Sequence, residues 1–82
     1  MKSILFEASD CPATVGVMTP GEYYFETVFV EYVTVTSGQL HVQQPGESDW
    51  NVYGVNETFM VEKDVIFRVR TQIDSSYICL YR

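Results

Sequence analysis

Between Thr14 and Thr27 the sequence reads TVGVMTPGEYYFET, and this stretch decides the fold class. Its centre, Thr19-Pro20-Gly21, is a turn signal, because proline fixes one backbone angle and glycine tolerates a sharp bend. Before the turn, valines alternate with Thr, Gly and Met, and after it Tyr23 and Phe25 share a face with Thr27. A spacing of two is the side-chain period of a β-strand, so the stretch predicts two strands joined by a tight turn.

The same period of two continues along the rest of the chain. Further alternating or apolar stretches occupy residues 3–8, 31–36, 39–43, 50–53, 58–61, 65–70 and 77–81. Turn signals such as Ser37-Gly38 and Pro45-Gly46 separate them. The sequence therefore predicts about nine short strands and no helix of useful length, in an all-β sandwich or small barrel.

Length and composition limit the class of protein. The 82 residues are enough for one domain, residues 1–82, and a core of that size is marginal alone, so we expect self-association. A hydrophobic content of 46% is too high for a disordered chain. The net charge of −6 argues against a nucleic-acid backbone or an anionic membrane as partner. With no apolar run of membrane-spanning length and no signal-peptide pattern, we expect a cytoplasmic protein.

Few residues are suited to metal or nucleophile chemistry. His41 is the one histidine, and period two places it opposite Leu40 and Val42, facing solvent. Cys11 and Cys79 have neither the number nor the spacing of a metal site or a disulfide framework. We therefore expect no metal, no cofactor and no catalysis by a serine–histidine or cysteine–histidine pair. The glycines are isolated, which excludes a glycine-rich phosphate loop.

Glu31 is the most informative polar residue. Period two puts it on the same face as Val33 and Val35, so an inward strand face would carry a carboxylate towards the core. Burial of an unpaired charge is costly, which predicts a polar opening with hydrogen-bond donors around this group. The alternative is that the strand begins at Tyr32 and that Glu31 belongs to a solvated turn; pattern alone leaves both open.

Arg68 and Arg70 alternate with Val69 and therefore project to one face. Two parallel guanidinium groups could bind a phosphate. The alternative, which the pattern favours, is a charged outer face, because Phe67 and Val69 occupy the inner one. Most of the aromatic residues are expected in the core or an interface, except for an inward tyrosine whose hydroxyl reaches a cavity.

The chain resembles a known family. The segment Thr14-Val15-Gly16-Val17-Met18, followed by Pro20-Gly21-Glu22-Tyr23, resembles the opening of the small cupins described as pyrimidine/purine nucleoside phosphorylases. The resemblance continues nearly to the end of the chain. Its later positions are Phe25, Thr27, Glu31, Thr34-Val35, Gly38, Trp50, Tyr53, Phe59, Val61, Phe67, Tyr77-Ile78-Cys79 and Tyr81.

The resemblance implies a single-domain cupin-like β-barrel of the jelly-roll type, usually a homodimer. It implies a pentosyl transfer in which a nucleoside and inorganic phosphate give a free base and a pentose 1-phosphate, with broad base specificity. Glu31 and Gly38 fit the seven-residue spacing of the first cupin motif, whereas the metal-binding histidines of that motif are missing and Thr27 stands near one of their places.

Three departures from the family pattern stand out. The family has an additional segment before the position of Lys2-Ser3-Ile4, so we expect a strand and part of the dimer contact to be absent. Residues 62–65 read Glu-Lys-Asp-Val where the family typically has Pro or Gly followed by Ser, and Val30 replaces a common proline. If this turn contributes to the phosphate pocket, the change would reduce activity.

The predicted site follows from the mechanism of phosphorolysis. Glu31 is the candidate catalytic residue, because a carboxylate can bind ribose hydroxyls and stabilise positive charge on the sugar. The candidate substrate-binding residues are Tyr23, Phe25, Thr27, Phe67, Tyr77 and Tyr81, and the weakest candidates, for phosphate, are Arg68 and Arg70. The alternative function is a non-catalytic small cupin that binds a sugar-like or aromatic ligand, or a dimerisation module.

Overall fold

The computed structural model describes residues 2–7 and 11–82, and these form nine β-strands without a helix. The strands are β1 (Lys2–Glu7), β2 (Pro12–Met18), β3 (Gly21–Glu26), β4 (Glu31–Ser37), β5 (Gln39–Gln43), β6 (Asn51–Gly54), β7 (Thr58–Val61), β8 (Ile66–Thr71) and β9 (Ser75–Tyr81). The described residues therefore include no helix that could cross a membrane. The predicted all-β class is confirmed.

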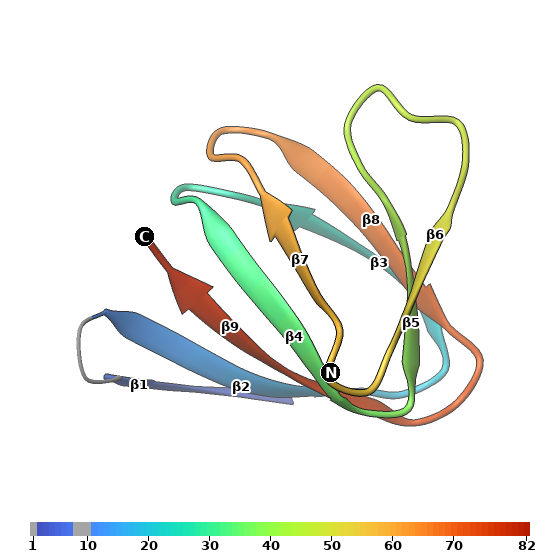
Figure 1. Cartoon of the computed structure of the whole chain (residues 1–82), viewed down its shortest axis with the longest axis horizontal. Helices are drawn as coiled ribbons and strands as arrows, with labels where there is room; N and C mark the ends of the chain where they lie inside the picture. The colour runs from blue at the N-terminus through green and yellow to red at the C-terminus, as the bar shows by residue number, and fades with distance from the viewer. Residues whose placement is uncertain (1, 8–10) are drawn as a thin grey trace.

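The strands form two antiparallel sheets that face each other (Figure 1). One sheet has the order β1-β2-β9-β4-β7, and the other has the order β3-β8-β5-β6. Turns such as residues 27–30 and 62–65 carry the chain from one sheet to the other. The chain crosses between the sheets only in turns, and no described strand of one sheet forms hydrogen bonds with a strand of the other sheet. The predicted barrel is therefore not closed, although the architecture is cupin-like.

The core lies between the two sheets and comes from the inward faces predicted by period two. Its members are Met18, Val33, Val35, Leu40, Val42, Phe59, Val61, Phe67, Val69, Tyr77 and Cys79. On β2 the inward residues are Thr14, Gly16 and Met18, while Val15 and Val17 face outward. His41 lies on the outer face of β5, as predicted from buried Leu40 and Val42 on either side.

Thr27 joins the two turns at one end of the sandwich. Its hydroxyl donates to the carbonyl of Glu62 at 2.7 Å and accepts from the amide of Val65 at 3.0 Å. Its backbone amide also donates to the Val65 carbonyl, and its carbonyl accepts from the Asp64 amide. This buried side chain thus fixes the 62–65 turn against the start of the 27–30 turn.

Gly16 packs against the ring of Tyr77, its direct partner across the β2–β9 pair. A Cβ atom at position 16 would collide with the ring and hydroxyl of Tyr77. Glycine is therefore required here by close approach.

We expect Gly16→Ala to lower the free energy of unfolding by about 1–3 kcal/mol, because the new methyl group must displace the tyrosine. The measurement is urea unfolding followed by circular dichroism. Gly54→Ala is the matched control, since the nearest atom to its new Cβ would be a Glu57 oxygen at an ordinary 3.5 Å. Equal losses in the two variants would contradict the packing assigned to Gly16.

Candidate functional site

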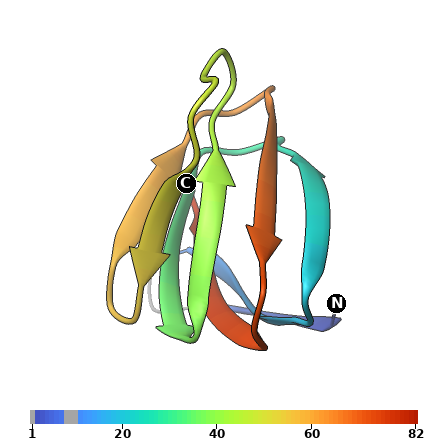
Figure 2. The same cartoon turned by 90° about the vertical axis from the view of Figure 1, so that its right-hand side faces the viewer.

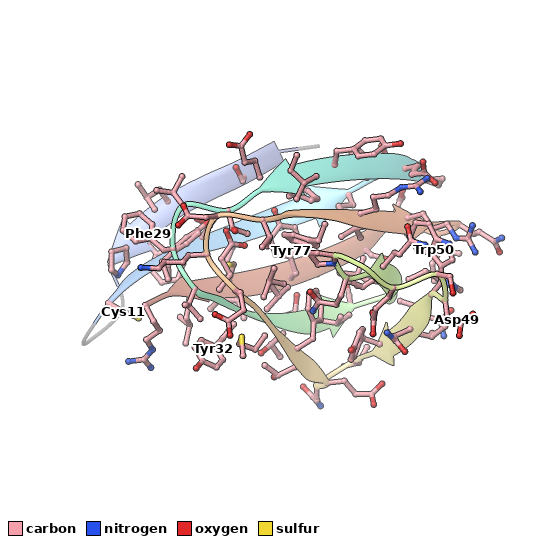
Figure 3. The ribbon with its side chains drawn as sticks, turned by 90° about the horizontal axis from the view of Figure 1, so that it is seen from above. Cys11, Phe29, Tyr32, Asp49, Trp50 and Tyr77 are labelled. Carbon is pink, nitrogen blue, oxygen red and sulfur yellow. The ribbon has the colours of Figure 1, made fainter. Side chains whose placement is uncertain are left out.

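A cavity of about 550 Å³ lies between the sheets. Its lining is mostly apolar, and its residues are Ser3, Leu5, Thr14, Met18, Phe25, Glu26, Val28, Phe29, Glu31, Val33, Leu40, Phe59, Phe67, Val69, Tyr77, Cys79 and Tyr81. Figure 3 shows Tyr77 between the sheets, with Phe29 towards one end of the molecule and Trp50 at the other. A concave, mainly apolar site with a few polar groups is the usual form of a small-molecule pocket.

Glu31 is the first residue of β4 and lines this cavity. In the sheet it stands between Val61 on β7 and Tyr81 on β9, so its neighbours on both sides are fixed by strand pairing. Of the two sequence interpretations, the inward carboxylate is therefore the one observed. Burial raises the pKa of the Glu31 carboxyl group, and a hydrogen bond from Cys79 opposes that rise.

The inward face of β9 carries Tyr77, Cys79 and Tyr81, and all three line the cavity. The Cys79 thiol donates to Glu31 Oε1 at 3.5 Å. Burial raises the pKa of Cys79 and of Tyr77 to about 12, and it also raises the pKa of Tyr81. All three groups therefore remain protonated near neutral pH and present hydrogen-bond donors to the cavity.

Aromatic rings from both sheets and from the 27–30 turn form part of the cavity wall. Phe25 and Phe67 stack with centroids 5.4 Å apart, and Phe67 meets Phe59 edge-on at 6.4 Å. Phe29 contacts Tyr81 edge-on at 6.4 Å between centroids. Such rings can accept the flat face of a nucleobase.

The structure brings five of the predicted site residues together on this cavity. They are Glu31, Phe25, Phe67, Tyr77 and Tyr81. Tyr23 and Thr27 share their inward face but lie outside the lining, and backbone carbonyls accept hydrogen bonds from their hydroxyls. Tyr23 donates to the Thr19 carbonyl at 2.7 Å, and Thr27 holds the 62–65 turn.

Arg68 and Arg70 lie on the outer face of β8, away from the cavity lining, because Phe67 and Val69 occupy the inward positions. Arg68 forms an ion pair with Glu22 at 2.8 Å, which matches the charged outer face favoured by the pattern. Both guanidinium groups lie over the Trp50 ring, with Cζ of Arg70 at 4.1 Å and Cζ of Arg68 at 5.2 Å from the ring centroid. These contacts anchor the end of the β5–β6 loop, which extends beyond the sheets (Figure 2).

Among the lining residues that were not predicted as site residues, Cys79 and Thr14 form hydrogen bonds with predicted ones, Glu31 and Tyr81. The signal for Cys79 was present, since a residue midway between two inward tyrosines must face inward as well. Thr14 donates its hydroxyl proton to Tyr81 Oη at 2.9 Å, a contact that only the β2–β9 pairing reveals.

The ionisable groups of the cavity lining include acids but no bases among the described residues. The lining contains two carboxyl groups, Glu26 and Glu31, and no lysine, arginine or histidine among the residues that the structure describes. Nor does any group of three His, Cys, Asp or Glu side chains suited to a metal ion occur in residues 2–7 and 11–82.

Glu31→Gln should stabilise the protein at neutral pH. A carboxyl whose pKa is raised above its ordinary 4.5 binds its proton more tightly in the folded state, so its contribution to stability falls as pH rises through that range. We expect Glu31→Gln to exceed the wild type by about 1 kcal/mol at pH 7 and to equal it near pH 4. Urea unfolding at both pH values measures this, with the exposed Glu62→Gln as control. A variant that is less stable at pH 7 would contradict the assigned burial.

Comparison with known proteins identifies the family. The family model for pyrimidine/purine nucleoside phosphorylase matches residues 1–81. A pyrimidine/purine nucleoside phosphorylase from Alcanivorax borkumensis is 49% identical over 79 residues, 96% of this chain and 84% of the relative. One from Psychromonas ingrahamii is 44% identical over 82 residues, 100% of this chain and 87% of the relative.

Solved structures agree on the fold. A protein of unknown function from Vibrio parahaemolyticus superposes with a TM-score of 0.93 at 39% identity, covering 98% of this chain and 85% of that one. A cupin-2 domain protein from Shewanella frigidimarina superposes with a TM-score of 0.79 at 14% identity, covering 99% and 80%, which supports the cupin-like fold alone. From the match over nearly its whole length, the chain belongs to the pyrimidine/purine nucleoside phosphorylase family, as the resemblance in residues 14–23 predicted.

Proposed function

We propose that this chain, as a single domain, is a nucleoside phosphorylase of broad base specificity. The observation that carries the proposal is the Glu31 carboxyl group in an aromatic-walled cavity of about 550 Å³, a volume suited to a small-molecule ligand. The reaction class comes from the names of the relatives, whose sequences match nearly the whole of this chain.

In the proposed reaction an oxygen of HPO₄²⁻ attacks the anomeric carbon as the bond from that carbon to the base nitrogen breaks. The bonding electron pair leaves with the base, and the phosphate proton moves to it, so pentose 1-phosphate and neutral base are formed. Glu31 binds the ribose hydroxyls and stabilises positive charge on the sugar. Phe25 and Phe67 stack against the base, the Tyr77 hydroxyl donates to the base or to phosphate oxygens, and Tyr81 contributes its ring to the pocket wall.

Broad specificity has a physical reason in this arrangement. The aromatic wall contacts the face of a base, which purines and pyrimidines share, whereas the polar groups of the cavity are concentrated around Glu31. A site that holds the sugar by hydrogen bonds and the base by stacking discriminates weakly between bases.

One observation favours a second candidate, a non-catalytic cupin that binds a sugar-like or aromatic ligand. No described basic side chain lines the cavity to attract the phosphate dianion. If neutral donors are the only phosphate ligands, phosphate binding will be weak. Binding of a nucleoside without phosphate-dependent turnover would favour this second candidate.

We expect purified protein with inosine or uridine and phosphate to release free base, and to release none when phosphate is omitted. Glu31→Gln should lower kcat at least about tenfold, because the amide cannot stabilise positive charge. Glu62→Gln, an exposed carboxylate on the 62–65 turn, is the matched control. No release by folded protein would refute the enzyme proposal, and unchanged turnover of Glu31→Gln would refute its role.

We further propose that the protein is a cytoplasmic homodimer that pairs through the outer face of the β1-β2-β9-β4-β7 sheet. Six large apolar side chains on this face are at least a third exposed: Ile4 (68%), Phe6 (37%), Val15 (37%), Val17 (51%), Tyr32 (39%) and Met60 (43%). They alternate with the inward residues of their strands, and cross-strand pairs such as Ile4–Val15 and Tyr32–Met60 bring them together.

The occupant that fits this face is a second copy. Polar members of this face satisfy each other, as Thr34 does with Thr58 and Thr36 with Ser76. The six apolar residues expose on the order of 500 Å², a large part of the roughly 800 Å² per partner in a standard interface. Two chains of net charge −6 repel each other, so a face rich in exposed apolar side chains is where they can approach.

We expect Val17→Lys to convert the dimer to monomer, because pairing would bury two unpaired charges in an apolar interface. Val52→Lys is the matched control, since Val52 is similarly exposed, at 47%, on the other sheet. Sedimentation velocity measures both variants. A wild-type monomer, or a Val17→Lys dimer as stable as the wild type, would contradict the proposed interface.

A further inference from the structure

The contacts of Glu31 connect it to a second strand pair. Cys79 lies beside it on the inward face, where β9 pairs with β4 on one side and with β2 on the other. Glu31 is opposite Tyr81 across the first pair, and Thr14 is opposite Cys79 across the second. Strand register therefore places these four side chains in two neighbouring cross-strand pairs, Thr14–Cys79 and Tyr81–Glu31, which together form a polar row between β2 and β4.

The hydrogen bonds within this row all donate in the direction from Thr14 towards Glu31. Thr14 Oγ1 donates to Tyr81 Oη at 2.9 Å, so the phenol proton is not used in that bond. Tyr81 and Cys79 lie two residues apart on the inward face of β9, and both line the cavity. Hydrogen bonding between them lowers the pKa of Cys79 and raises that of Tyr81, the direction expected when the phenol donates to the sulfur. Cys79 in turn donates to Glu31 Oε1 at 3.5 Å.

Glu31 depends on this row because no other described residue donates a hydrogen bond to it. The titratable groups that face it are Tyr77, Cys79 and Tyr81 from β9 and Glu26 from the end of β3, none of which is a cation. From the remaining elements the lining is hydroxyl or apolar. The thiol is therefore the one described contact that favours the carboxylate over the neutral acid.

We propose that Thr14, Tyr81 and Cys79 form a donor relay that positions Glu31, holding Oε1 and leaving Oε2 for the substrate. Cys79 is the positioning residue that touches the carboxylate, and Thr14 acts on it through Tyr81. The inference rests on the proposed function for its catalytic consequence, but the relay itself is a property of the free protein. Each bond of the chain polarises the next, so its effect on Glu31 exceeds that of a lone thiol.

The test is the titration of Glu31 in the free protein, followed by ¹³C NMR of labelled glutamate side-chain carboxyl groups. The Glu31 signal is assigned from its absence in Glu31→Gln. We expect Cys79→Ala to raise the pKa of Glu31, and Cys79→Ser, which keeps a donor at this position, to leave it close to the wild type. Cys11→Ser, which lies outside the cavity lining, is the matched cysteine control.

The relay also predicts non-additive effects. Thr14→Val should raise the pKa of Glu31 in the wild-type background and leave it unchanged in the Cys79→Ala background, where the chain is already broken. If kcat/KM can be measured, Cys79→Ala should reduce it about five- to tenfold at pH 6 and less at pH 8, moving the acidic limb to higher pH. Cys79→Ser should restore both values.

Two results would overturn the proposal. One is an unchanged Glu31 titration in folded Cys79→Ala, and the other is an equal displacement in Cys79→Ala and Cys79→Ser, which would indicate packing and not hydrogen bonding. Circular dichroism establishes folding of each variant. Because the titration needs no substrate, absence of phosphorolysis would refute the proposed function while leaving the relay to be decided by NMR.

Discussion

The candidate site depends on the burial of one carboxyl group between two sheets whose facing surfaces are mostly apolar. Glu31 begins β4 and faces the same cavity as Phe25, Phe67 and Tyr77. Removal of a carboxylate from water is costly, and here the described protein offers one weak thiol donor in return. A folded protein retains so poorly compensated a charge where a ligand supplies the missing hydrogen bonds, which is why this residue marks the site.

The sandwich holds this group on the wall of the cavity. The strand pairs β2–β9 and β4–β9 hold the polar row, while β3 and β8 bring the aromatic wall to face it. Thr27 holds the 62–65 turn close to the 27–30 turn, whose Val28 and Phe29 contribute to the lining. The sequence of the 62–65 turn differs from the family pattern. Its conformation is fixed by backbone hydrogen bonds to Thr27, and these do not involve the side chains that differ.

Period two predicted much of this arrangement, because side-chain direction in a strand is a local property. It gave Glu31 the same face as Val33 and Val35 but left a solvated turn open as the alternative, and it favoured an outer face for the arginines. It could not separate the cavity from the rest of the inner face. Tyr23 and Thr27 are inward, yet neighbouring carbonyls use their hydroxyls, and Cys79 becomes significant only through its distance to Glu31. The predicted cupin-like fold is present, but whether its two sheets pair at their edges could not be predicted, since pairing between distant strands has no local signature.

The most direct test of a ligand site at Glu31 is an NMR titration of the protein with ribose 1-phosphate. Glutamate carboxyl and tyrosine ring signals report on the cavity, and the indole signal of Trp50, which lies over the outer arginines, reports on the other surface. We expect saturable shifts of the Glu31, Tyr77 and Tyr81 signals with Trp50 unchanged. Shifts confined to Trp50, with the cavity signals unmoved at saturating ligand, would contradict the account.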